Sequence, residues 1–135
     1  MEEMKTAMRN RNAPHIDFGF LKGKIKKNEK FLPSDLDMIA HRGKHFFIAE
    51  WKAREEGKSD ERLSIGQEIL LKALAKLENF DIYLIYYKRL NKDPWQEIIE
   101  FKNMSDEGDK GWCEKQFIET YRKWYDKADK EKWKK

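Results

Sequence analysis

Residues 32–53, LPSDLDMIAHRGKHFFIAEWKA, decide the fold of this chain. Two short runs rich in β-forming residues, 36–41 and 45–52, flank a turn that contains glycine, which is typical of a β-hairpin. Alternation along the second run predicts two faces, with Phe46, Ile48, Glu50 and Lys52 on one and His45, Phe47, Ala49 and Trp51 on the other. Because both faces are apolar over most of their length, we expect a central strand that is covered on both sides.

Glu50 and Lys52 stand near the end of this strand, where a buried strand normally carries Val or Ile. Burying a carboxylate and an amine is costly unless each finds a partner or a use. A salt-bridge ladder at a strand edge is the structural alternative. The apolar residues around the pair favour burial, and charged groups in such surroundings are candidates for a functional site.

The turn decides which acid lies opposite Glu50. In one register, Gly43 and Lys44 are the two central turn residues, with glycine first as a type II′ turn prefers. Asp37 is then the cross-strand partner of Glu50. If the turn is centred one residue earlier, Asp35 takes that place. The turn preference favours Asp37.

A pair of acids in this arrangement points to a bound cation. Cross-strand partners have Cβ atoms about 4.5 to 5.5 Å apart, and like charges placed so are destabilising. The two carboxylates therefore need a shared proton or a shared cation. Mg²⁺ fits because it takes one or two protein carboxylates, keeps several waters and completes its coordination with substrate phosphate oxygens. Lys52, on the face of Glu50, would lie beside this ion, near an attacking water and the scissile phosphate.

The sequence PSDLD at 33–37, followed by EWK at 50–52, resembles the PD-(D/E)XK nuclease superfamily. This group includes restriction endonucleases, archaeal Holliday-junction resolvases and many small viral nucleases. The resemblance covers residues 31–87, and the chain departs from the family pattern in Ser34, which stands between the proline and the first aspartate. It implies an α/β fold with a restriction-endonuclease-like αβββαβ core, in which helices flank a central mixed β-sheet.

The resemblance also implies roles for single residues. Asp37, or Asp35 in its place, and Glu50 would hold the metal, and Trp51 would add its backbone carbonyl as a ligand. Lys52 would orient or polarise the attacking water and stabilise charge in the transition state.

Gln67 begins a predicted helix, in the segment SIGQEILLKAL, and has two interpretations. It matches a glutamine that some nuclease relatives carry at the start of the helix after the motif. It also completes an S-x-x-Q capping box with Ser64. The two are partly compatible, because a helix N-terminus attracts phosphate.

The hydrophobic pattern outside the hairpin predicts six further elements. These are a helix over 1–10, a strand or strand pair over 16–27, a helix over 64–79, a strand over 81–87, an extra C-terminal strand over 95–102 and a basic aromatic helix over 112–130. In the 64–79 helix the apolar residues at helical spacing are Ile65, Ile69, Leu70, Ala73, Leu74 and Leu77.

The chain has 135 residues, of which 39% are hydrophobic, 13% aromatic and 40% charged. This length predicts one domain over residues 1–135, and the aromatic content argues against wholesale disorder. A single cysteine excludes an internal disulfide, and no apolar run reaches the roughly 20 residues of a membrane helix. The first residues do not form a signal peptide. We expect an intracellular protein, in the cytoplasm or, if viral, the host cytoplasm.

The net charge is +4, with basic ends around an acidic middle. Basic flanks suit a polyanion such as nucleic acid, with a solvated charged surface as the ordinary alternative. The residues that could bind backbone phosphates are Lys22, Lys24, Lys26, Lys27, Arg122, Lys123 and Lys127. The aromatic stripe of the last helix could stack bases but is more typical of a core; it comprises Phe117, Tyr121, Trp124 and Tyr125. His41 and His45 flank the turn and are expected on the surface.

The sequence thus favours a Mg²⁺-dependent deoxyribonuclease in which Mn²⁺ is expected to substitute. We expect a structure-directed endonuclease, since one domain leaves no room for separate sequence readout. The resemblance to resolvases suggests a homodimer, and a protein partner could instead supply specificity. The alternatives are a non-catalytic nucleic-acid-binding or assembly module with a nuclease-like fold, and an RNA nuclease.

Overall fold

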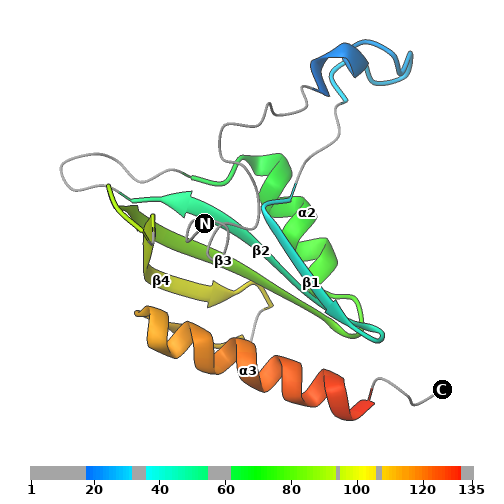
Figure 1. Cartoon of the computed structure of the whole chain (residues 1–135). Helices are drawn as coiled ribbons and strands as arrows, with labels where there is room; N and C mark the ends of the chain where they lie inside the picture. Colours follow the sequence, from blue (N-terminus) through cyan, green and yellow to red (C-terminus); the bar gives the residue numbers. More distant parts are fainter. Residues whose placement is uncertain (1–17, 32–35, 55–61, 94, 106–107, 132–135) are drawn as a thin grey trace, which may run out of the picture. The chain divides into compact units, whose positions relative to one another are not determined.

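The computed structural model describes residues 18–31, 36–54, 62–93, 95–105 and 108–131. The chain divides into two compact units, Met1–Asp35 and Leu36–Lys135. The second unit holds a five-stranded mixed sheet, one helix that follows the second strand and one C-terminal helix (Figure 1). In the part of the chain that is described, no helix has both the length and the apolar character of a membrane span.

The first unit contains a 3₁₀ helix, η1 (Phe18–Leu21), followed by turns up to residue 31. The strand or strand pair predicted over 16–27 is therefore wrong for its described part, 18–27. Local hydrogen bonds replace a ladder here: the Gly23 N–H donates to the Glu29 carbonyl at 2.9 Å, and Gly23 has a φ of +78°. The chain turns back on itself at this glycine. The helix predicted over 1–10 lies outside the described residues.

The predicted hairpin forms as β1 (Met38–Arg42) and β2 (His45–Ala53), and its register is confirmed. Arg42 pairs with His45 and Met38 with Ala49. Gly43 has a φ of +59°, the left-handed value that the first central residue of a type II′ turn requires. The paired ladder ends at Met38 and Ala49, and Asp37 stands directly before β1.

The remaining elements complete the sheet in the order β1-β2-β3-β4-β5. The helix α2 (Ile65–Ala75) connects β2 to β3 (Phe80–Arg89), which lies parallel to β2, so these three form a βαβ unit. The predicted extra strand is confirmed as β4 (Gln96–Asn103), antiparallel to β3. A two-residue strand, β5 (Lys110–Gly111), was not expected, because so short a run has no periodicity to detect. The chain then enters α3 (Glu114–Glu131).

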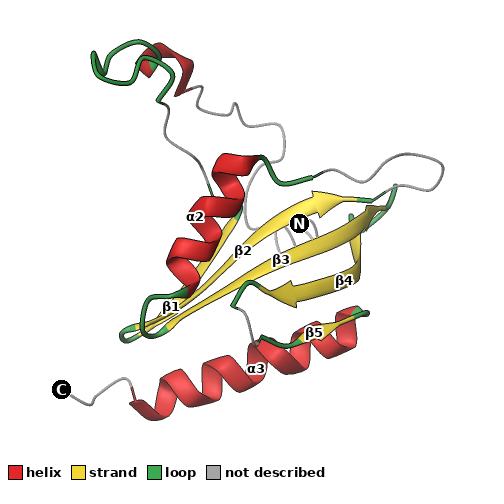
Figure 2. Cartoon of the chain, turned by 180° about the vertical axis from the view of Figure 1, so that it is seen from behind, coloured by secondary structure: helices red, strands yellow, loops and turns green. Residues whose placement is uncertain are grey.

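The two helices cover opposite faces of the sheet, as Figures 1 and 2 both show. On one face, Leu71 of α2 packs with Ile48 and Ile82. On the other, Phe117 and Trp124 of α3 belong to a larger cluster that is centred on Phe47 of β2. Strand β2 is therefore central and covered on both sides, as its apolar faces predict.

The helix α2 turns a different face to the sheet than its apolar pattern suggests. Ile65, Ile69 and Leu77 are 80%, 64% and 50% exposed, whereas Leu71 is 1% exposed. The inward face runs through Leu71, Leu74 and Ala75, which pack on or near Ile48 and Ile82. One turn before Leu71 this face carries Gln67, so its first inward position is polar.

The helix α3 uses its aromatic stripe mainly as core. Phe117 and Trp124 are both 7% exposed, and Tyr121 packs against the same cluster, while Tyr125 is 42% exposed. The expectation that His45 lies on the surface is wrong, because its ring is buried and its Nε2 lies 3.0 Å from a Glu131 carboxylate oxygen at the end of α3. Docking of α3 buries a residue that stands beside an exposed turn in the sequence.

Candidate active site at the end of strand β2

Glu50 is a nearly buried carboxylate, with 3% of its surface exposed. It lies on the face of β2 that α2 covers, because alternation along the strand puts it on the side of Ile48. Its Oε2 accepts a hydrogen bond from Nε2 of Gln67 at 2.6 Å. An ionised group at this depth is costly unless hydrogen bonds or opposite charge compensate it, so this amide stabilises the carboxylate directly.

Gln67 performs both tasks that its position suggests. Its Oε1 accepts from the Ser64 backbone N–H at 3.2 Å, and its own N–H donates to Ser64 Oγ at 3.1 Å, which forms the capping box of α2. Since the amide oxygen is used in the cap, the NH₂ group is directed to Glu50. The cap therefore sets the orientation of the donor that reaches the buried carboxylate.

Asp37 lies where the β1–β2 ladder ends. Its Oδ2 accepts the backbone N–H of Trp51 at 2.9 Å, so the carboxylate replaces the backbone acceptor that a longer β1 would supply. In an extended strand the N–H and C=O of one residue point to the same side. The Trp51 carbonyl is therefore directed to the same edge of β2 as the Asp37 carboxylate. Asp35, the alternative to Asp37, lies outside the described residues.

Lys52 follows Glu50 on the same face of β2 and is half-buried. Its partner in the parallel register with β3 is Tyr86. Of the predicted site residues, Gln67 contacts Glu50 directly, Asp37 binds the backbone of the residue after Glu50, and Lys52 shares the Glu50 face near the carboxyl end of β2. In open α/β sheets this is the end at which ligands usually bind.

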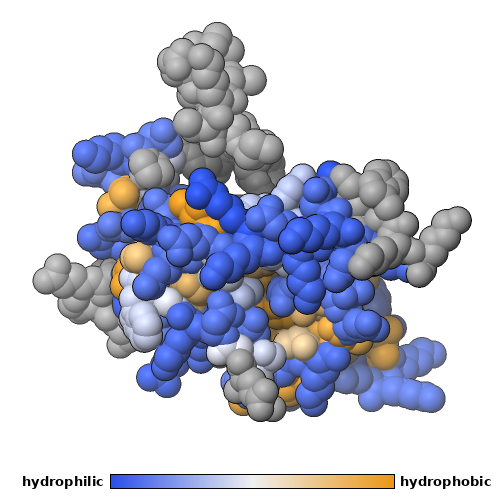
Figure 3. Space-filling model, turned by 90° about the horizontal axis from the view of Figure 1, so that it is seen from below, coloured by the Kyte–Doolittle hydropathy of each residue, from blue (hydrophilic) through white to orange (hydrophobic). Residues whose placement is uncertain are grey.

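Three of the seven predicted DNA-binding residues belong to the second unit, and they lie on the other side of its sheet from Glu50. Lys22, Lys24, Lys26 and Lys27 are exposed residues of the first unit. The other three, Arg122, Lys123 and Lys127, are on α3, which covers the face of the sheet opposite to Glu50. Figure 3, seen from the side of α3, shows a mostly hydrophilic surface with smaller apolar areas. These three cannot reach a phosphate held beside Glu50, because the sheet lies between them.

The donors at the site suit a hard cation. Among the described residues, no three or more His, Cys, Asp or Glu side chains form a group that could hold a metal ion by themselves. Two carboxylates and one backbone carbonyl are all oxygen ligands, which is the set that Mg²⁺ takes while it keeps water and substrate oxygens at its other positions. The residues present therefore fit such an ion.

A cluster that the sequence pattern did not single out continues the site along β2. The Arg54 guanidinium lies 4.2 Å from the centre of the Tyr86 ring, and its Nη1 lies 2.9 Å from Oε1 of Glu100. Tyr86 and Glu100 are cross-strand partners in β3 and β4. The available signal was alternation, because Arg54 follows Glu50 and Lys52 at the same two-residue spacing.

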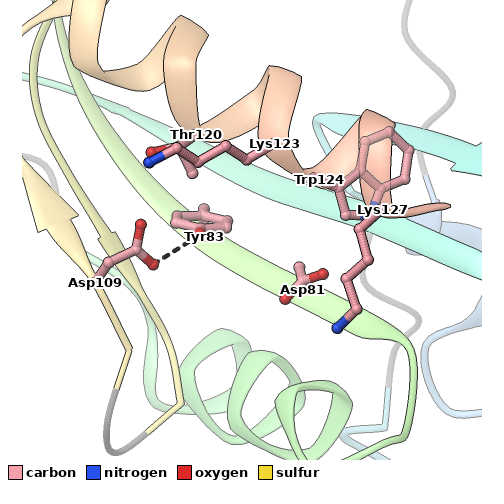
Figure 4. A pocket seen from close by; sticks show the side chains of 7 residues that line it. All are labelled: Asp81, Tyr83, Asp109, Thr120, Lys123, Trp124 and Lys127. Carbon is pink, nitrogen blue, oxygen red and sulfur yellow. Dashed lines mark hydrogen bonds between the residues drawn. The ribbon is translucent and has the colours of Figure 1, made fainter. Parts of the chain in front are cut away.

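A second polar site, a cavity of about 250 Å³, lies between α3 and the sheet and is shown in Figure 4. Its lining comprises Asp81, Tyr83, Asp109, Thr120, Lys123, Trp124 and Lys127. Tyr83 Oη donates to Asp109 Oδ1 at 2.8 Å, and burial, with this bond, raises the pKa of Tyr83 well above its ordinary value. Burial likewise raises the pKa of Asp81, which Lys127 opposes from across the cavity.

This cavity accounts for the environment of two predicted DNA-binding lysines. Lys123 and Lys127 share it with two carboxylates, Asp81 and Asp109, and Figure 4 shows Lys127 and Asp81 extending toward each other. Nearby carboxylates repel phosphate. The surroundings of these lysines therefore favour a structural role more than a grip on DNA.

Comparisons with protein-family models, with curated proteins and with solved structures find no match to this chain. The chemistry of the site therefore rests on the geometry of its own residues. That geometry is a buried carboxylate that accepts from an oriented amide, and a second carboxylate that accepts from the backbone N–H of the next residue along β2.

Proposed function

We propose that this protein is a Mg²⁺-dependent deoxyribonuclease with a restriction-endonuclease-like fold. One observation carries the proposal: Glu50 is 3% exposed, and the backbone N–H of the next residue, Trp51, donates to the Asp37 carboxylate at 2.9 Å. Placing two carboxylates so close, one of them buried, is unfavourable unless a cation offsets their repulsion. A protein that only needed a stable sheet would gain from apolar residues here.

The residues would divide the work as follows. Asp37, Glu50 and the Trp51 carbonyl would hold the ion, and the Gln67 amide keeps the Glu50 carboxylate in place at 2.6 Å. When bound, Mg²⁺ polarises the scissile phosphate and lowers the pKa of a bound water. Lys52 would orient the attacking water and offset the negative charge that grows on the phosphate oxygens. The N-terminus of α2 adds a favourable potential for a phosphate.

The fold supports the proposal over the part of the chain that carries the motif. A hairpin, then a helix, then a strand parallel to the second hairpin strand follow in the order of the αβββαβ core. The support begins at the second strand of that core, since residues 18–31 form a 3₁₀ helix and turns. In this assignment β4, β5 and α3 are additions after the core.

The proposed substrate is DNA that is recognised by its shape. The proposed site residues act on the phosphate backbone, which carries no direct sequence information. Branches, flaps or ends are therefore the expected targets, and a second copy of the chain or a partner protein would add specificity. The acid pair and lysine act on the phosphate and not on the sugar, so RNA is the substrate to test beside DNA.

A cleavage assay tests the proposal. Supercoiled, linear and branched DNA and a single-stranded RNA are incubated with the full chain and Mg²⁺, Mn²⁺ or EDTA. We expect DNA cleavage with either metal and none with EDTA. Glu50→Ala and Lys52→Ala should each lower kcat/KM by about 100-fold or more, because each removes a group that acts in the transition state.

Lys88→Ala and Glu97→Ala are the matched controls, since they break an exposed ion pair of 3.3 Å between β3 and β4. Both should cleave as the parent does. Undiminished cleavage in the Glu50 and Lys52 variants would mean that the site is elsewhere or that the activity is a contaminant. DNA binding without cleavage would favour the non-catalytic module, and cleavage of RNA alone would favour the RNA nuclease.

A further inference from the structure

Arg54 lies in line with the proposed catalytic residues. It directly follows β2, and its backbone N–H donates to the Tyr87 carbonyl at 2.8 Å, so the pairing with β3 continues through this residue. Alternation puts its side chain on the face of Glu50 and Lys52. The contact with Tyr86, the parallel partner of Lys52, agrees with that placement.

The guanidinium is held in a defined orientation. The Tyr86 ring supports its plane at 4.2 Å, and Glu100 binds Nη1 at 2.9 Å. The Arg54 side chain is 30% exposed, so it is neither in the core nor fully in solvent. A stacked arginine loses less conformational entropy when it binds a ligand, since its planar fork is already oriented.

The spacing along β2 suits a nucleic-acid backbone. Residues two apart in a strand are separated by about 6.6 Å, at about 3.3 Å per residue. This is similar to the distance between successive phosphates on one nucleic-acid strand. If Lys52 lies at the scissile phosphate, Arg54 reaches the neighbouring phosphate on the same strand. An arginine suits that position because its fork can bind two phosphate oxygens at once.

We infer that Arg54, supported by Tyr86 and Glu100, forms a second phosphate-binding subsite, for the phosphate next to the one that is cut. The inference rests on the proposed nuclease function. It assigns Arg54 to positioning of the substrate strand, whereas a purely structural stack would only tie β2 to β3 and β4. In the positioning role, the effect of Arg54 on cleavage depends on the charge of one particular phosphate. In the structural role it does not.

The test pairs a protein change with a substrate change. The position of the cut is first mapped on a DNA oligonucleotide with the parent chain and Mg²⁺. A series of oligonucleotides then carries one uncharged methylphosphonate linkage at each position on either side of the cut. For one linkage adjacent to the cut, we expect kcat/KM of the parent to fall about tenfold or more.

On the all-phosphate substrate, Arg54→Ala should lower kcat/KM by a similar factor, mainly through a higher KM. When that same linkage is uncharged, kcat/KM of Arg54→Ala should fall no further. Arg54→Lys should fall between the two, since it keeps the charge without the fork. The matched control is Arg42→Ala, which removes another arginine that stacks on a tyrosine, Tyr125, at 5.3 Å and pairs with a carboxylate, Asp129, at 2.8 Å. It lies at the α3 side of the sheet, and its effect should be the same for every linkage.

The outcomes separate the inference from the function on which it rests. One outcome is that the parent cuts, but the reductions in kcat/KM from Arg54→Ala and from the uncharged linkage multiply at every position. The subsite then does not exist, and the proposed nuclease function is retained. If Arg54→Ala matches Arg42→Ala in thermal unfolding and in insensitivity to the linkage position, its role is structural. If the parent cuts no oligonucleotide, the proposed function and the subsite both fail.

Discussion

The Gln67 side chain connects the folding of α2 to the proposed chemistry. One amide completes the helix cap through its oxygen and stabilises a buried carboxylate through its nitrogen. A change at Gln67 therefore affects both stability and the site. Loss of the Ser64 hydroxyl removes only its bond to the Gln67 N–H and keeps the Ser64 backbone N–H that orients the amide. This difference separates two roles that the sequence motif combines.

Ser64→Ala is expected to lower the free energy of unfolding by about 1 kcal/mol and to leave kcat unchanged, because it removes only the capping hydroxyl. Gln67→Ala should lower the free energy of unfolding by about 2 kcal/mol, because it also removes a donor from a buried carboxylate. It should lower kcat about tenfold. Urea unfolding and the cleavage assay measure the two effects. If the two variants behaved alike in both assays, the hydrogen bond from Gln67 to Glu50 would contribute nothing to cleavage.

Gln67→Glu is the complementary variant. Glutamate at this position preserves the capping box, because either residue can accept from the N-cap backbone. It replaces the donor to Glu50 with a like charge. A loss of cleavage with a retained helix cap is the expected result.

Asp81 predicts a pH dependence of stability. Burial raises its pKa in the folded protein above the ordinary value of 3.8. The folded state therefore holds the proton more tightly than the unfolded state, and stability falls as the pH rises through the folded pKa. Below 3.8, where both states are protonated, the cost of the charge is absent.

Asp81→Asn should therefore raise the thermal unfolding midpoint by a few degrees at pH 7, and the gain should vanish as the pH falls toward 3.8. Asp126→Asn, an exposed acid on α3, is the control and should show no such trend. Unfolding curves between pH 3.5 and 7.5 give the comparison. If the unfolding midpoints of Asp81→Asn and the parent differed by the same amount over that range, burial of the charged Asp81 would not be the cause of the difference.

At the scale of elements, the hairpin turn determines the site. The positive φ of Gly43 accompanies the register in which Met38 pairs with Ala49 and Asp37 stands directly before the ladder. A slip of one residue would exchange the faces of the strand and move Asp37 away from Trp51. Local turn chemistry thus affects the contact between Asp37 and the Trp51 backbone.

Gly43→Ala should destabilise the chain by about 1 kcal/mol, because an L-residue is strained at positive φ. Cleavage should fall as well if the altered turn shifts the register. Lys44→Ala is the control, as it changes the neighbouring turn residue without this strain. Unchanged unfolding in Gly43→Ala would show that the turn can adopt another type at no cost.

On the scale of the whole second unit, the two faces of the sheet differ in character. The α2 face carries Glu50, Lys52 and Arg54, while the α3 face carries the aromatic cluster and the cavity with Lys123 and Lys127. The backbone of the sheet separates the two sets of side chains, because successive side chains of a strand point to opposite faces, so groups on one face do not share a ligand with groups on the other. The proposed DNA path therefore follows the α2 face.

Patterns of short range were predicted well from the sequence. The hairpin, its register, the faces of β2, the capping box and the extra strand β4 all depend on neighbours within a few residues or on period-two alternation. The errors have another origin. The strand expected over residues 18–27 is replaced by a 3₁₀ helix and local turns, and His45 is buried by a helix more than sixty residues later in the chain.

The amino-acid sequence was enough to predict which residues share a face of β2 and the register of the hairpin from Met38 to His45, because turn type and strand alternation are local properties. Only the tertiary structure decided that α2 presents Gln67 and Leu71 to the sheet and leaves Ile65 and Ile69 exposed, and that the basic residues of α3 lie on the opposite side from the acids. The reason is physical: helix rotation and the choice of sheet face are set by packing between segments distant in sequence, and the best total burial need not follow the apolar stripe of a single helix.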